Sequence, residues 1–89
     1  MKIYYFKNDN CSVCAAVLPK VMKLSEDYDI DFEIIDVLEN PEFAGQHLVL
    51  TVPTVLIMEN GQELARFARN FSISDISSFI DRYLEVSKN

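Results

Sequence analysis

The chain has 89 residues, of which 49% are apolar and 25% are charged, and its formal net charge is −6 at pH 7. This apolar content excludes a disordered segment, and the length fits one compact domain, which we expect to span residues 1–89. The acidic balance argues against nucleic-acid binding, because a phosphate backbone requires clustered Lys and Arg side chains.

The first part of the chain alternates strand-like and helix-like patterns. Residues Lys2–Phe6 are rich in β-branched and aromatic side chains, which predicts a buried strand. Apolar residues then recur at spacings of three and four, which predicts a helix from about Ser12 to Asp27. Pro19 lies inside this helix and removes one backbone donor, so we expect a kink there. Ile30–Val37 begins with alternation and ends in an apolar run, and it predicts a second strand.

A short helix and a third strand follow. Asn40 stands at a predicted helix N-cap with Pro41 at the first helical position, a pairing that suits a helix start. This helix is expected to end near His47. Thr54–Met58 is a continuous apolar and β-branched run, which predicts the third strand.

The end of the chain combines a hairpin with a last helix. Asn60 and Gly61 precede the strand-like run Glu63–Ala68, and Asn-Gly between two such runs predicts a tight hairpin turn. Ser72 followed three residues later by Asp75 resembles a capping box, with Asp in place of the usual Glu. The apolar face of the helix that follows consists of Ile76, Phe79, Ile80, Tyr83 and Leu84.

These elements give the order β-α-β-α-β-β-α and an α/β fold class. A helix joins the first two strands, so we expect them to be parallel and their crossover to be right-handed. The hairpin makes the last two strands antiparallel.

No segment predicts a membrane span or a signal peptide. Apolar runs fall well short of the roughly 20 residues that a spanning helix needs, and the polar residues 7–10 interrupt the apolar start. We therefore expect a cytoplasmic protein with no membrane partner. Thiols are kept reduced in the cytoplasm, where a disulfide is usually catalytic or transient.

The only two cysteines, Cys11 and Cys14, lie where the first strand gives way to the first helix. A disulfide across so small a loop contributes little stability, so a structural bridge is a poor explanation for the pair. The helix N-terminus carries positive potential, so we expect the pKa of Cys11 to fall below the free value of about 8.5. The thiolate then attacks a substrate disulfide, and Cys14 attacks the mixed disulfide and completes the exchange.

Three other interpretations of the cysteine pair stay open. Half of a zinc site would need two further ligands, and His47 is the one plausible soft partner. The cysteines can also be inert buried side chains, or belong to a redox-silent binding domain. We expect neither a metal nor a cofactor.

The sequence resembles the thioredoxin-fold family over almost its full length. The C-x-x-C pair begins the resemblance, and Pro19 follows Cys14 by five residues, as the helix-kinking proline does in thioredoxins. Residues 51–54 (Thr-Val-Pro-Thr) match the cis-proline loop before the third strand. Residues 59–62 (Glu-Asn-Gly-Gln) match the closing hairpin.

The resemblance implies a four-stranded mixed sheet of order 2-1-3-4, flanked by three helices. It implies that a dithiol reaction at the cysteine pair reduces protein disulfides. Four residues are implied to bind substrate, namely Ser12, Val13, Val52 and Pro53, and the Val52–Pro53 bond is implied to be cis. An electron donor such as a thioredoxin reductase would reset the pair, and we expect a monomer.

Several positions depart from thioredoxins. Asn10 stands where they carry Trp, and Ser12-Val13 replaces their Gly-Pro. Tyr5 and Ile34 align with the family's buried Asp and its Lys partner. That Asp helps to move protons when the second cysteine reacts, so this assistance is left unassigned.

A glutathione-dependent, glutaredoxin-like enzyme is the main alternative. Glutaredoxins share the shorter architecture and the sequence Thr-Val-Pro. Their Gly-Gly pair and their Cys-Pro-Tyr-Cys motif are absent here, and Lys7 lies near, but not at, the position of their glutathione-binding Lys. Asp75 would suit a glutathione amine, although a helix cap is its simpler role.

Overall fold

Seven elements follow one another in the order predicted from the sequence. The computed structural model describes residues 1–87. Its elements are β1 (Lys2–Lys7), α1 (Ser12–Asp27), β2 (Asp31–Asp36), α2 (Pro41–Gln46), β3 (Thr54–Glu59), β4 (Gln62–Ala68) and α3 (Ile73–Ser87). The element ends predicted from the sequence lie within one residue of the observed ends.

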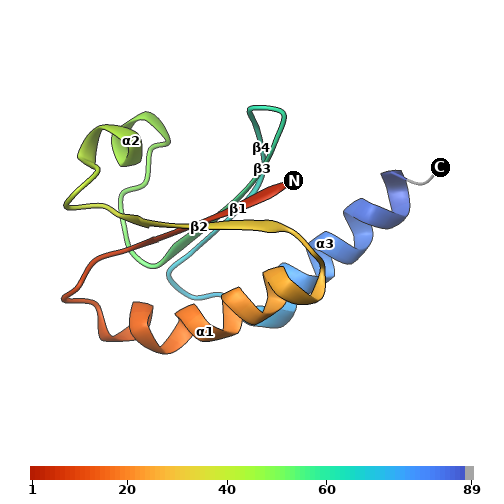
Figure 1. Cartoon of the computed structure of the whole chain (residues 1–89), viewed down its shortest axis with the longest axis horizontal. Coiled ribbons are helices and arrows are strands. Elements are labelled where there is room, and N and C mark those ends of the chain that lie inside the picture. Colours follow the sequence, from red (N-terminus) through yellow and green to blue (C-terminus); the bar gives the residue numbers. More distant parts are fainter. Residues whose placement is uncertain (88–89) are drawn as a thin grey trace.

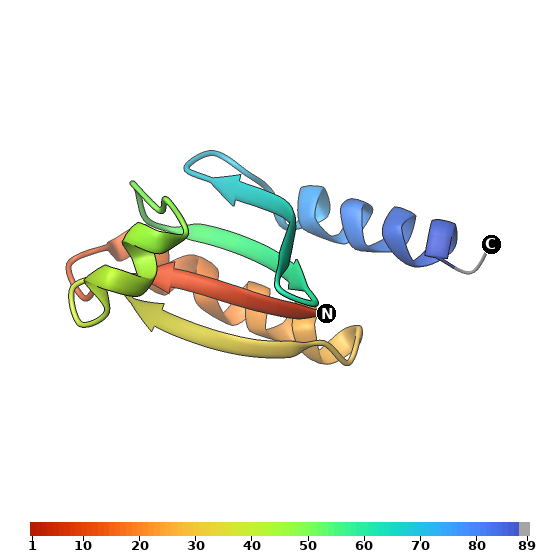
Figure 2. The same ribbon diagram turned by 90° about the horizontal axis from the view of Figure 1, so that it is seen from above.

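The four strands form one mixed sheet in the order β2-β1-β3-β4, as expected. β1 pairs parallel with β2 and antiparallel with β3, and β3 pairs antiparallel with β4. The sheet separates two layers of helices, with α1 and α3 on one face and α2 on the other (Figure 1). Seen from above, α1 crosses beneath the parallel strands β1 and β2 (Figure 2). No helix among residues 1–87 is long and apolar enough to cross a membrane.

Each face of the sheet has its own core cluster, which explains why β1 and β3 are apolar almost throughout. Ile3 and Tyr5 of β1 belong to the cluster that includes the buried residues of α1 and α3. Phe6 of β1 lies with Leu56 of β3 and Ala44 of α2 in the cluster on the other face. Because strand side chains alternate between faces, β1 contributes to both.

The starts of the later helices show one success and one error of the sequence analysis. At α3, the Asp75 N–H donates to Ser72 Oγ (3.1 Å) and the Ser72 N–H donates to Asp75 Oδ2 (2.9 Å), so the capping box is confirmed. At α2, Asn40 occupies the N-cap, but its side chain makes no cap hydrogen bond. Its amide donates instead to the Asp36 carbonyl (3.1 Å), which ties α2 back to the end of β2.

The hairpin between β3 and β4 forms as predicted. Asn60 and Gly61 both have positive φ, 52° and 78°, as the tight hairpin turn requires. α1 continues through Pro19 as one helix from Ser12 to Asp27.

Candidate active site

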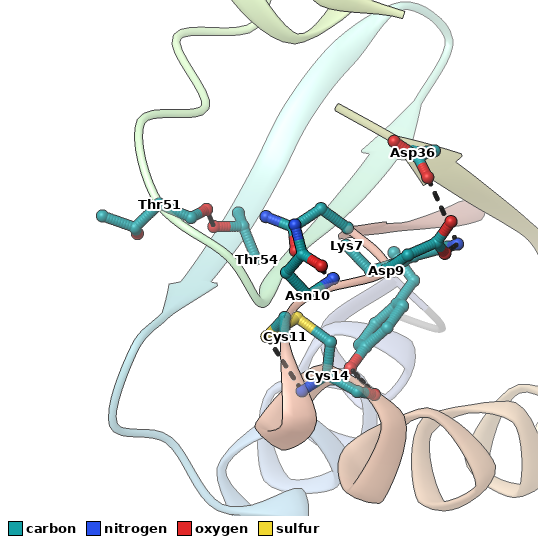
Figure 3. Close-up of a disulfide and its surroundings, with 10 residues drawn as sticks. Lys7, Asp9, Asn10, Cys11, Cys14, Asp36, Thr51 and Thr54 are labelled. Carbon is teal, nitrogen blue, oxygen red and sulfur yellow. Dashed lines mark hydrogen bonds and ion pairs between the residues drawn. A yellow bond between two sulfur atoms is a disulfide. The ribbon is translucent and has the colours of Figure 1, made fainter. Parts of the chain in front are cut away.

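The cysteine pair lies at the N-terminus of α1, just beyond the end of β1 (Figure 3). Cys11 is the N-cap residue, with extended backbone angles, and it forms a disulfide with Cys14 in the first turn. The Cys14 N–H donates to Cys11 Sγ over 3.1 Å. The sulfur of Cys11 thus takes the place of the oxygen that usually caps a helix.

The two cysteines differ sharply in accessibility. Cys14 is 2% exposed, whereas Cys11 is partly exposed and the intervening Ser12 and Val13 are exposed. An incoming disulfide therefore reaches Cys11 more readily than Cys14. This arrangement suits a reaction in which the Cys11 sulfur contacts the substrate and the Cys14 sulfur reacts only with Cys11.

Tyr5 lies beneath the first turn of α1. Its hydroxyl donates to the Cys14 carbonyl over 2.7 Å, and its side chain is fully buried. Burial raises the pKa of Tyr5 to about 12, so the phenol stays protonated at neutral pH. The sequence analysis treated Tyr5 as a departure from the thioredoxin pattern and missed this contact. Its alternation with Ile3 places it on the helix-covered face, but no sequence signal names a carbonyl as its partner.

A small ion cluster surrounds the segment that leads to Cys11. Lys7 Nζ binds Asp9 Oδ1 (2.8 Å) and Asp36 Oδ2 (3.4 Å), so it joins the ends of β1 and β2 to the loop (Figure 3). The hydrogen bond that Lys7 donates to Asp9, followed by the one that it donates to Asp36, raises the pKa of Lys7. Partial burial opposes ionisation of Asp36, but hydrogen bonds from the Leu38 and Glu39 N–H groups and from Lys7 outweigh it and lower the pKa. The ammonium of Lys7 is therefore bound by two carboxylates of the same chain, Asp9 and Asp36.

The segment before β3 passes beside the cysteine pair, where Figure 3 marks it by Thr51 and Thr54. The Val52–Pro53 bond is cis, as expected. Pro53 is buried and Val52 is partly buried. Thr54 Oγ1 donates to the Thr51 carbonyl over 2.7 Å, which closes this tight segment on itself.

The loop that leads into this segment carries two features that the sequence analysis missed. Arg66 of β4 donates to the carbonyls of His47 and Leu48, and Leu48 has a positive φ of 55°. Leu48 and Leu50 are 70% and 89% exposed, respectively. Arg66 thus holds a loop that presents apolar side chains to solvent, a link between distant residues that no local pattern announces.

The metal interpretation finds no support in the geometry. The ring of His47 packs on Phe43, with centroids 4.5 Å apart, and the two cysteines are bonded to each other. Within residues 1–87, no group of three or more His, Cys, Asp or Glu side chains is arranged to hold a metal ion.

Comparison with known proteins agrees with this geometry. The sequence profile of the thioredoxin family matches residues 2–82. The structure of thioredoxin 1 from Thermosipho africanus superposes with a TM-score of 0.96 and is 57% identical, with both chains covered in full. Fasciola hepatica thioredoxin is 27% identical with a TM-score of 0.81, over 91% of this chain and 78% of its own.

A curated thioredoxin of Staphylococcus aureus is 26% identical over 76 residues, which is 83% of this chain and 73% of its own length. The family profile, the close structural relative and the C-x-x-C pair at a helix start all lead to the same assignment. The chain belongs to the thioredoxin family and is a thiol–disulfide oxidoreductase.

Proposed function

We propose that the chain reduces disulfides of protein substrates by two successive exchanges, with Cys11 as the nucleophile and Cys14 as the resolving cysteine. The Cys11 thiolate attacks one substrate sulfur, forms a mixed disulfide and releases the other substrate sulfur as a thiolate. Cys14 loses its proton and attacks Cys11 Sγ, which releases the second substrate thiolate. Both released thiolates take up protons, and two electrons have passed from the cysteine pair to the substrate.

The observation that carries this proposal is the difference between the two sulfurs. Cys11 is partly exposed and its Sγ accepts the Cys14 N–H at a helix N-terminus, where a negative charge is favoured. Cys14 is almost fully buried, so an external disulfide has little access to it. The order of the two attacks follows from this difference in exposure and potential.

The substrate would lie across Ser12, Val13, Val52 and Pro53. Among residues 1–87, neither the backbone N–H nor the carbonyl of Val52 has a hydrogen-bond partner. Free backbone groups beside a reactive sulfur suit an extended peptide, which can pair with them as a strand does. A protein disulfide in an extended segment fits this requirement better than a compact small molecule.

A thioredoxin reductase is the electron donor that we expect to return the oxidised pair to the dithiol, and the cytoplasm is the compartment in which we expect the protein to act. Two coupled assays separate the donors, one with thioredoxin reductase and one with glutathione and glutathione reductase. Turnover of insulin in the first assay alone supports the proposal. Turnover in the second alone would favour a glutathione-dependent enzyme.

Trapping of the mixed disulfide tests the order of attack. Cys14→Ser is expected to hold a disulfide-linked substrate adduct on non-reducing gels, because the first exchange proceeds and the second cannot. Cys11→Ser is expected to hold none, since the remaining sulfur is buried. Equal trapping by both variants would contradict an ordered pair, and an absence of insulin reduction by the unaltered protein would favour a redox-silent binding domain.

A further inference from the structure

The buried contact between Tyr5 and the Cys14 carbonyl has no part in the exchange of sulfurs itself. The hydroxyl donates over 2.7 Å to the backbone of the residue that must make the second attack. Tyr5 is fully buried and Cys14 is 2% exposed, so water does not compete for this bond. The strand β1 therefore holds the first turn of α1 at Cys14 itself.

The side chains that pack around Tyr5 in its core cluster are apolar or aromatic. Its ring lies beside Phe32 of β2, and its core cluster is completed by apolar side chains of β3, α1 and α3. Tyr28 is the other titratable side chain of that cluster, and its hydroxyl binds Asp81 near the surface. Around the disulfide, Figure 3 shows the charged groups Lys7, Asp9 and Asp36, of which Lys7 binds both carboxylates.

No buried base is available to take the proton of Cys14. Within residues 1–87, the buried polar residues other than Tyr5 and Cys14 are Ser25 and Thr54, neither of which titrates in water. Tyr5 itself stays protonated up to about pH 12, because burial raises the pKa of its phenol. Among residues 1–87, no buried side chain is thus placed to take the proton of Cys14, and we infer that this proton leaves to solvent or to a released substrate thiolate.

We propose that Tyr5 is a positioning residue for the resolving step, because its neutral hydroxyl fixes the Cys14 carbonyl and so aims the Cys14 sulfur at Cys11. This inference rests on the proposed roles of Cys11 and Cys14. Tyr5 orients the second attack and does not accept the proton. The pH dependence of that attack then reports the ionisation of Cys14 alone.

The two exchanges are separable with dithiobisnitrobenzoate, a small aromatic disulfide that releases a coloured thiolate. Rapid mixing of the reduced protein with equimolar reagent gives one release from the attack of Cys11. A second release follows from the attack of Cys14 on the mixed disulfide. The first rate depends on reagent concentration and the second does not, so each step has its own rate.

Tyr5→Phe removes only the hydroxyl, and Tyr4→Phe makes the same change on the other face of β1, where Tyr4 packs on Phe43. We expect Tyr5→Phe to slow the second release by about fivefold and to leave the first unchanged, as loss of one buried hydrogen bond implies. Tyr4→Phe is expected to change neither rate. Thermal unfolding of each variant is measured in parallel.

The pH profile distinguishes positioning from proton transfer and from a purely structural role. The second release is expected to rise with pH through one inflection, at the same pH in the unaltered protein and in Tyr5→Phe, with a lower plateau in the variant. A variant that loses thermal stability but keeps the full plateau would overturn the inference, as would an inflection that moves by one unit or more.

The unaltered protein supplies a test that does not depend on how well the variant folds. Two inflections in its second release would reveal a further base and overturn the inference. One inflection supports it. If no second release occurs even in the unaltered protein, the proposed order of attack has failed, which is a separate outcome from a failure of the role of Tyr5.

Discussion

The starts of α1 and α3 share the same capping geometry but serve different purposes: the start of α1 holds the reactive sulfur, and the start of α3 stabilises its helix. In α3, Ser72 Oγ accepts the N–H of the residue three positions later, and Asp75 returns the bond. In α1, Cys11 Sγ accepts the N–H of the residue three positions later, and within residues 1–87 the Cys11 N–H donates to the Asn8 carbonyl rather than to a side chain. One start is closed by a reciprocal pair, and the other leaves a sulfur with a single backbone donor.

The first turns also differ in charge. Asp75 places a carboxylate at the start of α3, whereas the first turn of α1 contains no acidic residue. A carboxylate at a helix N-terminus occupies the positive potential of the aligned peptide groups. The positive potential at the start of α1 is thus left to the sulfur of Cys11, whereas in α3 the carboxylate of Asp75 occupies it and stabilises the helix.

The largest expected effect comes from Cys11→Ser, which replaces the reactive sulfur at the N-cap of α1 with a hydroxyl. Reduction of insulin by a dithiol donor is expected to fall to the uncatalysed rate, because a serine hydroxyl does not attack disulfides. The helix content by circular dichroism should persist, since serine is among the best N-cap residues. Loss of α1 in this variant would show that the sulfur is needed for folding as well as for chemistry.

A carboxylate introduced into the first turn of α1 should lower the reactivity of Cys11. Val13→Asp is expected to slow alkylation of Cys11 by iodoacetamide at neutral pH by about three- to tenfold, because a nearby negative charge disfavours the thiolate. Ser74→Asp makes the matched change at the second position of α3 and should leave alkylation unchanged. Equal rates in the unaltered protein and Val13→Asp would show that the helix start does not set the reactivity.

Removal of the carboxylate from α3 should affect stability and leave chemistry alone. Asp75→Ala is expected to cost about 1 kcal/mol, because it deletes half of the capping box. For a chain of this size, that loss corresponds to a melting temperature lower by about 4–8 °C. Ser78→Ala, at an exposed interior position of α3, is the control and should not destabilise. A slower disulfide reduction by folded Asp75→Ala would argue that α3 also serves the site.

A further effect is expected at alkaline pH, and it concerns the hydrogen bond that supports the first turn of α1 from below. The unfolded chain loses the Tyr5 proton near pH 10, whereas the folded chain keeps it to about pH 12. The unfolded state therefore binds fewer protons in this window, and stability falls as pH rises through it. The free energy of unfolding, measured with urea at several pH values between 10 and 12, should fall less steeply with pH in Tyr5→Phe than in the unaltered protein. The same pH dependence in both proteins would contradict the burial of Tyr5.

The sequence predicted the elements and the cysteine site because both depend on local patterns. Alternation and helical spacing define strands and helices, and the C-x-x-C pair stands directly at a predicted helix start. Asn60 and Gly61 specified their turn because positive φ is a property of the residues themselves. These features needed no knowledge of distant parts of the chain.

The remaining features depend on partners that are far apart or lie on the backbone. Tyr5 binds a carbonyl, and any residue at position 14 would present one. Arg66 reaches the carbonyls of a loop 18 and 19 residues earlier, so its sequence neighbours give no hint. The side chain of Asn40 can either cap α2 or bind another part of the chain, and it donates to the Asp36 carbonyl at the end of β2.

The hydrogen bond from the Cys14 N–H to Cys11 Sγ couples two properties of the protein. These are the order of the first turn of α1 and the tendency of the cysteine pair to give up electrons. A thiolate accepts this bond more strongly than a sulfur held in a disulfide, so the bond stabilises the reduced form. By linkage, a partner that orders the first turn of α1 would make the protein a weaker reductant, and one that frays the turn would make it a stronger one. Docking can thus tune electron transfer without touching either sulfur.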